Sequence, residues 1–369
     1  MAEPREAFIG IDAAKLRNAV AIADAGRDGE VRFLGEVDAS PEGMRRLAAK
    51  LAAKYDRLNF CYEAGPTGYG LHRLLTDLGH HCVVVAPSLI PRKPSDRVKT
   101  NRRDAITLAR LLRAGELTPV WVPDPAHEAI RGLIRARAAA AKEVGIKKRQ
   151  VGAFLLRHSR LFSRKKAWGA RYRRWLQEQG FEHPADQIVL QELVDGVRVA
   201  EERLVRLGRA IEEFLPTWSL APLVEALQAL RGVDLVTAAT FVVEVGDLRR
   251  FKSPRQLMGY LGLVPGERST GETVRRGSIT KMGNARVRHL LVESAWTYRH
   301  PPRVGAKKLP KLERVSPTIR EIAWKAQSRL TARYRAFVAR GKKTTVTCTA
   351  IARELAAFMW AVAREVRPA

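Results

Sequence analysis

The stretch AFIGIDAAKLRNAVAIADAGRDGEVRFLGEV, residues 7–37, decides the fold of the first part of this chain. It holds three apolar runs, AFIGID, NAVAIAD and EVRFLGEV, with the turn-rich AGRDGE between the last two. Short apolar runs separated by Gly and Asp are typical of consecutive strands joined by turns. We therefore expect a β-meander at the start of the chain.

Helical and strand patterns alternate after this opening. SPEGMRRLAAKLAAKY predicts an amphipathic helix with Ser40 as its N-cap. NFCYEAG is typical of a strand that ends at Glu63, TGYGLHRLLTDLG of a helix stopped by Gly79, and HCVVVAP of a buried strand. An antiparallel opening followed by alternating helices and strands predicts an α/β layer with a mixed sheet.

A helix that begins in VKTNRRDAITLARLLRAG, residues 98–115, carries an acidic residue near its start. Two interpretations of Asp104 are open. In the first, Asn101 is the N-cap and Asp104 completes a capping-box variant that also complements the helix dipole. In the second, Asp104 leads an inward stripe with Leu108 and Leu111, where a carboxylate is costly unless it is paired or bound to a metal.

Two further carboxylates, Asp12 and Glu63, each close an apolar strand. Taken singly, each is explained as a turn or loop residue. Together with Asp104 they supply the oxygen ligands and negative charge that a hard divalent cation requires, with positions left open for phosphate oxygens. Their order along a meander, a strand and a helix matches a ribonuclease H-like nuclease core, which favours the metal-site interpretation.

The charge balance indicates a polyanionic partner. The chain has 369 residues, with 66 Lys and Arg against 38 Asp and Glu, and a formal net charge of +28. Such an excess causes self-repulsion unless nucleic acid neutralises it. The three cysteines show no metal or disulfide spacing, and no uninterrupted apolar run approaches a membrane helix. We therefore expect a soluble cytoplasmic protein that binds nucleic acid and no membrane.

Long charged helices replace the α/β pattern from about residue 123. They predict a helical hairpin or coiled-coil arm. Between them, RKKAWGARYRRWLQEQGF interleaves cations with Trp168, Tyr172 and Trp175. This composition fits a nucleic-acid groove, and it fits equally an amphipathic helix whose aromatic side chains lie in the core.

The last region, from residue 216, is mostly helical. Its LRGVDLVTAATFVVEVGDLRRF resembles a helix-hairpin-helix, in which backbone N–H groups of a glycine turn bind phosphate. Asp234 stands at the place of the second glycine and would repel phosphate. We therefore expect a structural hairpin at this point.

Two candidate nucleophiles lie in LGLVPGERSTGETVRRGSITKMGN, residues 261–284. A serine hydroxyl needs a base, a metal or a cation to become a good nucleophile. We favour Ser269 over Ser278, because Ser278 precedes a helix and is explained as a turn or capping residue. Four nearby cations suit a scissile phosphate: Arg268, Arg275, Arg276 and Lys281. Three glycines would let the backbone approach DNA closely: Gly271, Gly277 and Gly283.

The motifs of this chain form an ordered set: FIGIDAAK, YEAGPTGYGL, VKTNRRDAITLARLLRAGELTPVWVP, GDLRRFKSPRQLMGYLGLVP and STGETVRRGSITKMGNARVRHLLVESAW. As a set they resemble the DEDD-type transposases of the insertion-sequence 110 family over nearly the whole chain. The fold class expected is α/β plus all-α. It comprises a RuvC/ribonuclease H-like mixed sheet domain (residues 1–122), a helical coiled-coil arm (123–215) and a mostly helical C-terminal transposase domain with a catalytic serine (216–369).

The resemblance places an acidic tetrad at Asp12, Glu63, Asn101 and Asp104, where it implies Mg²⁺ binding. Asn101 stands where the family has Asp. An Asn side chain still offers a neutral carbonyl oxygen to the metal. We therefore expect a site with one negative charge fewer and weaker metal affinity.

The implied activity is that of a DNA transposase and recombinase. Members of the family cleave and exchange DNA strands under the guidance of a structured bridge RNA that pairs with donor and target DNA. The nucleophile falls at Ser269, in the Ser-x-Gly segment, and would form a 5′-phosphoserine intermediate. The resemblance also implies dimers or tetramers with composite active sites, in which the arm mediates assembly and RNA contact.

Basic side chains in three segments are the expected contacts to nucleic acid. They are Arg102, Arg103, Arg164, Lys165, Lys166, Arg268, Arg275, Arg276 and Lys281. Two alternative functions stay open. One is a RuvC-like metal-dependent junction endonuclease that uses water and is indifferent to Ser269→Ala. The other is a catalytically decayed nucleic-acid-binding protein.

Overall fold

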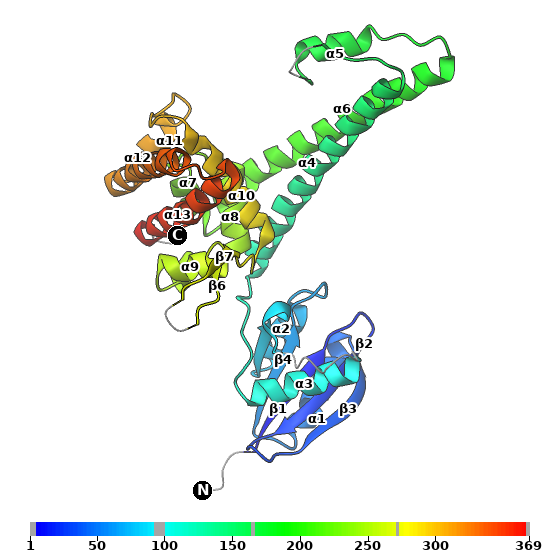
Figure 1. The fold of residues 1–369 in the computed structure, drawn as a ribbon. Helices are drawn as coiled ribbons and strands as arrows, with labels where there is room; N and C mark the ends of the chain where they lie inside the picture. Colours follow the sequence, from blue (N-terminus) through cyan, green and yellow to red (C-terminus); the bar gives the residue numbers. More distant parts are fainter. Residues whose placement is uncertain (1–4, 92–99, 164–166, 271–272, 367–369) are drawn as a thin grey trace. The chain divides into compact units, whose positions relative to one another are not determined.

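The computed structural model describes residues 5–91, 100–163, 167–270 and 273–366 (Figure 1). The chain divides into two compact units, residues 1–122 and 123–369. The expected further division of the second unit at residue 216 stays a prediction.

A five-stranded mixed sheet is the framework of the first unit, with the strand order β3-β2-β1-β4-β5. The first three strands pair antiparallel, as the meander pattern predicted. β4 pairs parallel with β1, and β5 pairs parallel with β4. The expected mixed sheet is thus confirmed. The strands are β1 (Glu6–Asp12), β2 (Arg17–Asp24), β3 (Val31–Asp38), β4 (Arg57–Glu63) and β5 (His81–Val85).

Helices cover both faces of this sheet. α1 (Pro41–Ala52) and α2 (Gly70–Asp77) pack on the face that carries Ile9 and Ile11. The predicted Ser40 N-cap of α1 is confirmed, because its hydroxyl accepts a hydrogen bond from the N–H of Gly43 at 3.1 Å.

α3 (Asn101–Arg113) covers the opposite face of the sheet. There, Ala105 and Ala109 lie against Ala19 and Ala21 of β2. Small side chains on both elements let the helix approach the sheet closely, which fixes the position of its first turn. A short 3₁₀ turn, Pro87–Leu89, follows β5.

Two long helices form an antiparallel pair in the second unit. α4 (Pro125–Arg157) and α6 (Pro184–Phe214) run side by side, with α5 (Ala170–Gln177) at their far end (Figure 1). Arg203 of α6 pairs with Glu143 of α4 at 2.9 Å. The long helices match the sequence prediction, while a regular coiled coil stays a prediction.

The rest of the second unit is mostly helical, as expected, and a two-stranded hairpin interrupts it. The helices are α7 (Ala221–Leu227), α8 (Leu235–Val245), α9 (Pro254–Tyr260), α10 (Ala285–Ala295), α11 (Leu309–Glu313), α12 (Pro317–Ala339) and α13 (Thr344–Glu365). The hairpin strands are β6 (Pro265–Glu267) and β7 (Arg276–Ile279). Three 3₁₀ turns accompany them: Leu215–Thr217, Leu248–Arg250 and Trp296–Arg299.

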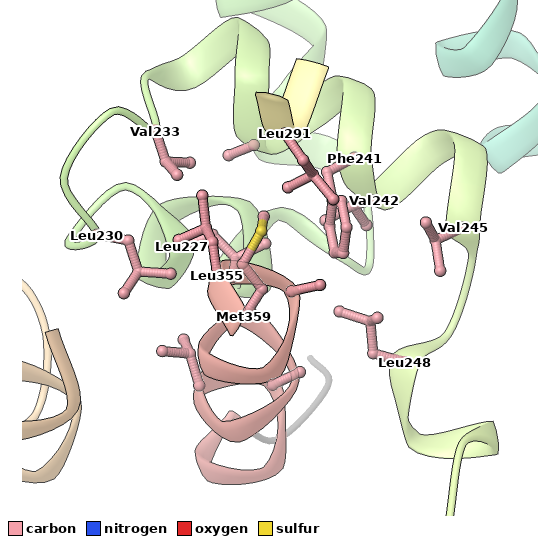
Figure 2. Packing of buried hydrophobic residues seen from close by; sticks show 14 of the residues in the cluster. Leu227, Leu230, Val233, Phe241, Val242, Val245, Leu248, Leu291, Leu355 and Met359 are labelled. Carbon is pink, nitrogen blue, oxygen red and sulfur yellow. The ribbon is translucent and has the colours of Figure 1, made fainter. Parts of the chain in front are cut away.

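One hydrophobic core holds these helices together. Leu355 and Met359 of α13 lie toward Leu227 of α7 and Leu291 of α10 (Figure 2). Residues at the base of α4 and α6 belong to the same core, among them Ile134. The base of the arm is therefore built into the C-terminal helices.

α13 is long and apolar enough, by length and composition, to cross a membrane. Half of its most apolar window is buried inside the second unit, and a buried core helix passes the same test. Its Leu355 and Met359 are 0% exposed. Its apolar character is accounted for by its central place in the core.

Candidate active site

The register of the central strands places two acidic residues at one edge of the sheet. β1 and β4 are parallel neighbours, and Ile11 stands beside Tyr62. Asp12 and Glu63 follow as the last residues of the two strands. Strands end at the same edge when they are parallel, so these carboxylates share that edge.

Strand alternation also places the two carboxylates on one face. Gly10 of β1 lies against α3, and Cys61 of β4 packs against Leu108 of α3. Side chains two residues apart on a strand point to the same face. Asp12 and Glu63 therefore lie on the face that α3 covers.

α3 brings its first turn to this same edge. A Cβ atom on Gly10 would lie against the carbonyl oxygen of Ala105. At the other end of the helix, Arg113 donates hydrogen bonds to the carbonyl oxygens of Asp24 and Gly29, at 3.1 and 2.7 Å.

The direction of α3 follows from these contacts. Asp24 pairs with Ala7 near the start of β1, so the C-terminal end of α3 lies over the beginning of that strand. The helix consequently runs antiparallel to β1, and its first turn points toward the strand end. Asp104, half-buried in that turn, belongs to the same edge and face as Asp12 and Glu63.

The predicted cap of α3 is wrong. Thr100 is the N-cap, and its hydroxyl accepts a hydrogen bond from the N–H of Arg103 at 3.3 Å. Asn101 is the first helical residue and is exposed. Thr and Asn are both good caps, so the local sequence alone could not separate them.

The inward stripe of α3 differs from the predicted one by one position. Ala105, Leu108 and Ala109 are buried, whereas Asp104 and Leu111 are half-buried. The alanine-lined surface of the sheet takes the small side chains of the helix. Asp104 thus lies at the border of the contact.

The donor set at this edge fits a hard divalent cation in its chemistry, because carboxylate and amide oxygens are the ligands that such ions prefer. The side chains are not gathered into a formed cluster. Within the described ranges, no three His, Cys, Asp or Glu side chains lie close enough together to hold a metal ion. The backbone therefore brings the carboxylates to one edge without bringing their oxygens into a common coordination sphere.

The candidate nucleophile lies on the β6–β7 hairpin of the second unit. Ser269 is exposed, two residues beyond Glu267, the last residue of β6. Its hydroxyl donates a hydrogen bond to Oε1 of Glu267 at 2.8 Å. Arg276 of β7 stands opposite Glu267 and lies 3.5 Å from its Oε2.

Glu267 is the functional candidate that the sequence interpretation missed. The signal available was the Glu-x-Ser spacing, which places two side chains on the same side of an extended segment. A carboxylate that accepts a serine hydroxyl is placed to take its proton.

The alternative serine has a different environment from the one expected. Ser278 is an exposed residue of β7, so the interpretation as a turn or capping serine is wrong. Asn284 caps the following helix instead, and its Oδ1 accepts a hydrogen bond from the N–H of Arg286 at 2.9 Å.

The glycine nearest that helix serves internal packing. Gly283 has φ +69°, and a Cβ atom there would lie against the carbonyl oxygen of Tyr260. Arg288 donates hydrogen bonds to the carbonyl oxygens of Leu261 and Gly283, at 3.2 and 3.1 Å. Close approach within the protein therefore accounts for Gly283, and its expected approach to DNA stays a prediction.

A buried carboxylate links the arm to the helix that follows the hairpin. Glu244 of α8 has a side chain that is 2% exposed, and Arg135 of α4 donates to both of its oxygens at 2.8 Å. Asn284 also donates to its Oε2 at 2.8 Å. Burial alone would raise the pKa of Glu244, but these hydrogen bonds hold that pKa below its ordinary value.

The aromatic side chains of the arm tip lie in a small core. Tyr172 is 6% exposed, and Trp168 and Trp175 pack around it. Of the two interpretations of this segment, the structure supports core packing. Lys148 lies over the ring of Trp168, 5.1 Å from its centroid.

The expected helix-hairpin-helix is structural, as predicted. Asp234 is the N-cap of α8, and its Oδ1 accepts a hydrogen bond from the N–H of Thr237 at 2.8 Å. The carboxylate occupies the helix start where a phosphate would have to bind.

The predicted nucleic-acid contacts are surface cations wherever the structure describes them. Arg102 is exposed and lies over the ring of Phe33, 5.5 Å from its centroid. The other exposed members are Arg103, Arg268, Arg275, Arg276 and Lys281. Outside the described residues lie Arg164, Lys165 and Lys166.

Two family models match this chain. The model described as "Transposase IS116/IS110/IS902 family" matches residues 224–308. A DEDD model of IS110 type, described as "Transposase", matches residues 9–159. The second match contains the acidic sheet edge, and the first contains the serine hairpin.

Relatives resemble the chain over most or all of its length. "Putative transposase y4qE" of Sinorhizobium fredii is 65% identical over 367 residues, which cover 100% of this chain and 91% of the relative. "Transposase for insertion sequence element IS1533" of Leptospira borgpetersenii is 29% identical over 345 residues, 92% of this chain and 99% of the relative. "Probable family 20 transposase" of Pseudomonas aeruginosa is 28% identical over 240 residues, 63% of this chain and 69% of the relative.

Proposed function

Because this chain belongs to the IS110 family of DEDD transposases, we propose that it cleaves and exchanges DNA strands with its acidic sheet edge and the serine of its β6–β7 hairpin. The observation that supports this proposal is that the backbone of β1, β4 and α3 carries Asp12, Glu63 and Asp104 at one edge and on one face of the sheet. A cation shared with a substrate phosphate would offset the repulsion between carboxylates that lie at one edge of the sheet.

The metal of the proposal is Mg²⁺, and its ligands are Asp12, Glu63 and Asp104 with the amide oxygen of Asn101. When bound, the ion would supply positive charge to the scissile phosphate. The four side chains offer oxygen donors only, which fits a hard cation. Asn101 removes one negative charge from the family pattern, so we expect a weaker metal affinity.

The hydroxyl of Ser269 attacks phosphorus in the proposed chemistry. Glu267 accepts the hydroxyl proton along the existing 2.8 Å hydrogen bond. The bond from phosphorus to the 3′-oxygen breaks, that oxygen takes up a proton from water, and a 5′-phosphoserine link remains. The reverse attack by a 3′-hydroxyl of another strand restores the phosphodiester and frees the serine.

The guanidinium groups of the hairpin stabilise charge on the phosphate. Arg268, Arg275 and Arg276 are exposed on the strands and turn that carry the serine. Arginine binds phosphate oxygens with paired, directional N–H donors. In the transition state they would face the charge that develops on the equatorial oxygens.

Assembly and guidance complete the proposal. A bridge RNA would pair with donor and target DNA, and the chain would act as a dimer or tetramer with composite active sites. The arm offers exposed cations to such an RNA, among them Arg157, Arg160, Arg171 and Arg174. Their positive charge suits a phosphate backbone without sequence preference.

A covalent-adduct assay tests this function. The protein and its guide RNA are incubated with Mg²⁺ and labelled donor and target DNA, and the adduct is separated under denaturing conditions. We expect Ser269→Ala to lower adduct formation by more than about 10³-fold. Glu267→Gln is expected to lower the rate by roughly 10²-fold or more, because the proton acceptor is removed.

Ser278→Ala is the matched control on the same hairpin, and it should leave the adduct unchanged. Asp104→Asn should abolish cleavage without abolishing DNA binding. Cleavage that persists in Ser269→Ala would favour water attack by a junction endonuclease. Binding without any Mg²⁺-dependent product from the unaltered protein would favour the decayed nucleic-acid-binding protein.

A further inference from the structure

A pocket of about 240 Å³ lies in the second unit and shares no residue with the proposed active site. It is framed by the turn after α7, the segment before α11 and one face of α12. Its lining residues are Ala229, Arg231, Arg303, Val304, Lys308, Leu312, Arg320, Ala323, Trp324 and Gln327.

The apolar wall of the pocket carries an exposed aromatic ring. Trp324 is 52% exposed, and Val304 is 41% exposed. A tryptophan left half in water forgoes a large hydrophobic gain, and such rings are enriched where proteins bind partners. The ring is therefore available to a ligand.

Two of the four cations in the lining hold the pocket in shape. Nη1 of Arg231 donates to the carbonyl oxygen of Pro301 at 2.8 Å and lies 3.4 Å from Oε1 of Gln327. Nζ of Lys308 donates to the carbonyl oxygens of Leu230 and Val233, at 2.8 and 2.6 Å. These bonds tie the turn after α7 to α12 and to the segment before α11.

The other two cations are Arg303 and Arg320, and both are exposed. Among the described residues that line the pocket, none has a carboxylate. The charged side chains of the lining are therefore all cationic, which suits an anionic ligand.

The spacing on α12 sets the ring beside a cation. Arg320 and Trp324 are four residues apart, and Gln327 follows three residues later. Residues at these intervals lie on one face of a helix. A ligand that stacks on Trp324 thus has a guanidinium one helical turn away.

We propose that this pocket binds one unpaired nucleotide of a DNA strand. The indole stacks on the base, Arg303 and Arg320 bind the adjacent phosphates, and the pocket volume admits a single ring system. Sites that enclose whole drug-sized ligands occupy roughly 300–1,000 Å³. The proposal rests on the proposed function, because strand exchange produces unpaired DNA.

Other ligands fit the lining less well. Duplex DNA keeps its bases stacked on one another, so it offers no free face to the indole. An acidic peptide would satisfy the arginines but would leave the ring without a planar partner. An unpaired nucleotide uses both features together.

Binding of a labelled oligo-dT of about 12 nucleotides to the full-length protein tests the proposal, since single-strand sites span roughly 4–16 nucleotides. Trp324→Ala is expected to weaken the affinity about tenfold, and Trp324→Phe should stay within about twofold because a ring remains. The double variant Arg303→Ala with Arg320→Ala is expected to weaken it about tenfold and to reduce its salt dependence by about two phosphates.

Arg335→Ala is the matched control, because Arg335 is an exposed arginine of α12 that does not line the pocket. It should weaken oligo-dT binding less than the pocket arginines do. Thermal unfolding verifies that every variant is folded, which the exposure of Trp324 leads us to expect. An equal effect of Arg335→Ala, or no effect of Trp324→Ala, overturns the proposal.

Two further arms identify the source of the nucleotide. An effect of Trp324→Ala on a duplex as large as that on oligo-dT contradicts an unpaired ligand. Oligo-rU that binds more tightly than oligo-dT, with the same dependence on Trp324, assigns the pocket to RNA and overturns the DNA proposal. If the covalent adduct depends on Ser269 but oligo-dT binding does not depend on Trp324, only the pocket proposal is refuted. If oligo-dT binding depends on Trp324 but no adduct depends on Ser269, only the serine chemistry is refuted.

Discussion

At the scale of single residues, Gly10 is a point where the sheet and the backbone of α3 approach closely. The residue stands two positions before Asp12 and has no side chain where the helix backbone passes. A Cβ atom added at Gly10 would collide with the backbone carbonyl oxygen of Ala105 and the backbone nitrogen of Ala109. The position of Asp104 relative to Asp12 therefore depends on this glycine.

Gly10→Ala should destabilise the first unit by about 1–3 kcal/mol, because an added methyl group in a packed contact forces α3 away from the sheet. The free energy of unfolding, measured with urea, checks this. DNA cleavage should fall as well, since Asp104 moves with the helix.

Gly70→Ala is the control for that measurement, because nothing lies within 4 Å of the Cβ position at Gly70. It should leave the stability of the first unit within about 0.5 kcal/mol of the unaltered protein. A Gly10→Ala protein that is as stable as Gly70→Ala would show that α3 does not rest on the strand.

At the scale of elements, helix α4 joins the arm to the C-terminal core through its first turns. His127 of α4 is 1% exposed, and its Nε2 lies 2.8 Å from the carbonyl oxygen of Val243. Its ring meets Trp218 edge-on, with the ring centroids 5.0 Å apart. The imidazole is thus a neutral core group at the base of the arm.

The stability of the second unit should fall as pH decreases below about 6.5. Burial lowers the pKa of His127 from its ordinary value of 6.5, so the unfolded chain takes up a proton that the folded protein resists. The contribution of His127 to the free energy of unfolding is fully present above pH 6.5. It decreases as the pH falls from 6.5 to the lower pKa of the folded protein, by at most about 1.4 kcal/mol per pH unit. Thermal unfolding between pH 8 and about pH 5 follows this loss.

His127→Phe is the control, because it keeps a ring against Trp218 and removes the titration. The difference in free energy of unfolding between the two proteins isolates the contribution of His127. If the unaltered protein becomes more stable relative to His127→Phe as the pH falls, the buried imidazole is not neutral.

At the scale of the whole molecule, the net charge of +28 dominates its encounters with nucleic acid. The described cations that were predicted to contact nucleic acid are exposed, so they can exchange counterions for phosphates. Affinity from this source has little sequence preference and strong dependence on salt. In the proposed function, a guide RNA supplies the selection of a site.

The logarithm of the DNA association constant should fall linearly with the logarithm of the salt concentration. With roughly 6–10 phosphate contacts, the loss between about 50 and 200 mM salt is on the order of 10³–10⁵. Arg268→Ala combined with Arg275→Ala should reduce the slope by about two. Binding titrations at several salt concentrations measure it.

Arg198→Ala gives the comparison for that slope, because Arg198 is already paired with Asp195 and Glu202, at 3.1 and 2.9 Å. Its removal should leave the slope nearly unchanged. If the slope does not change when the hairpin arginines are replaced, these arginines do not contact DNA phosphates.

Much of the architecture could be predicted because its signals are local. Short apolar runs indicated β1 and β2, helical periodicity indicated α4 and α6, and Ser40 indicated the start of α1. The cap of α3 could not be predicted in the same way. Thr100 and Asn101 are adjacent residues of similar capping strength, and packing of the helix on the sheet selected between them.

The sequence by itself determined the family and the order of the elements, because these depend on neighbours along the chain. Only the tertiary structure decided that the strand ends and the first turn of α3 meet on one face, since that follows from strand pairing and the contact at Gly10. The tertiary structure also placed Glu267 within hydrogen-bonding distance of Ser269 and packed the aromatic side chains of the arm into a small core. Such outcomes depend on which surfaces distant in sequence pack against each other, and a local sequence pattern cannot predict this packing.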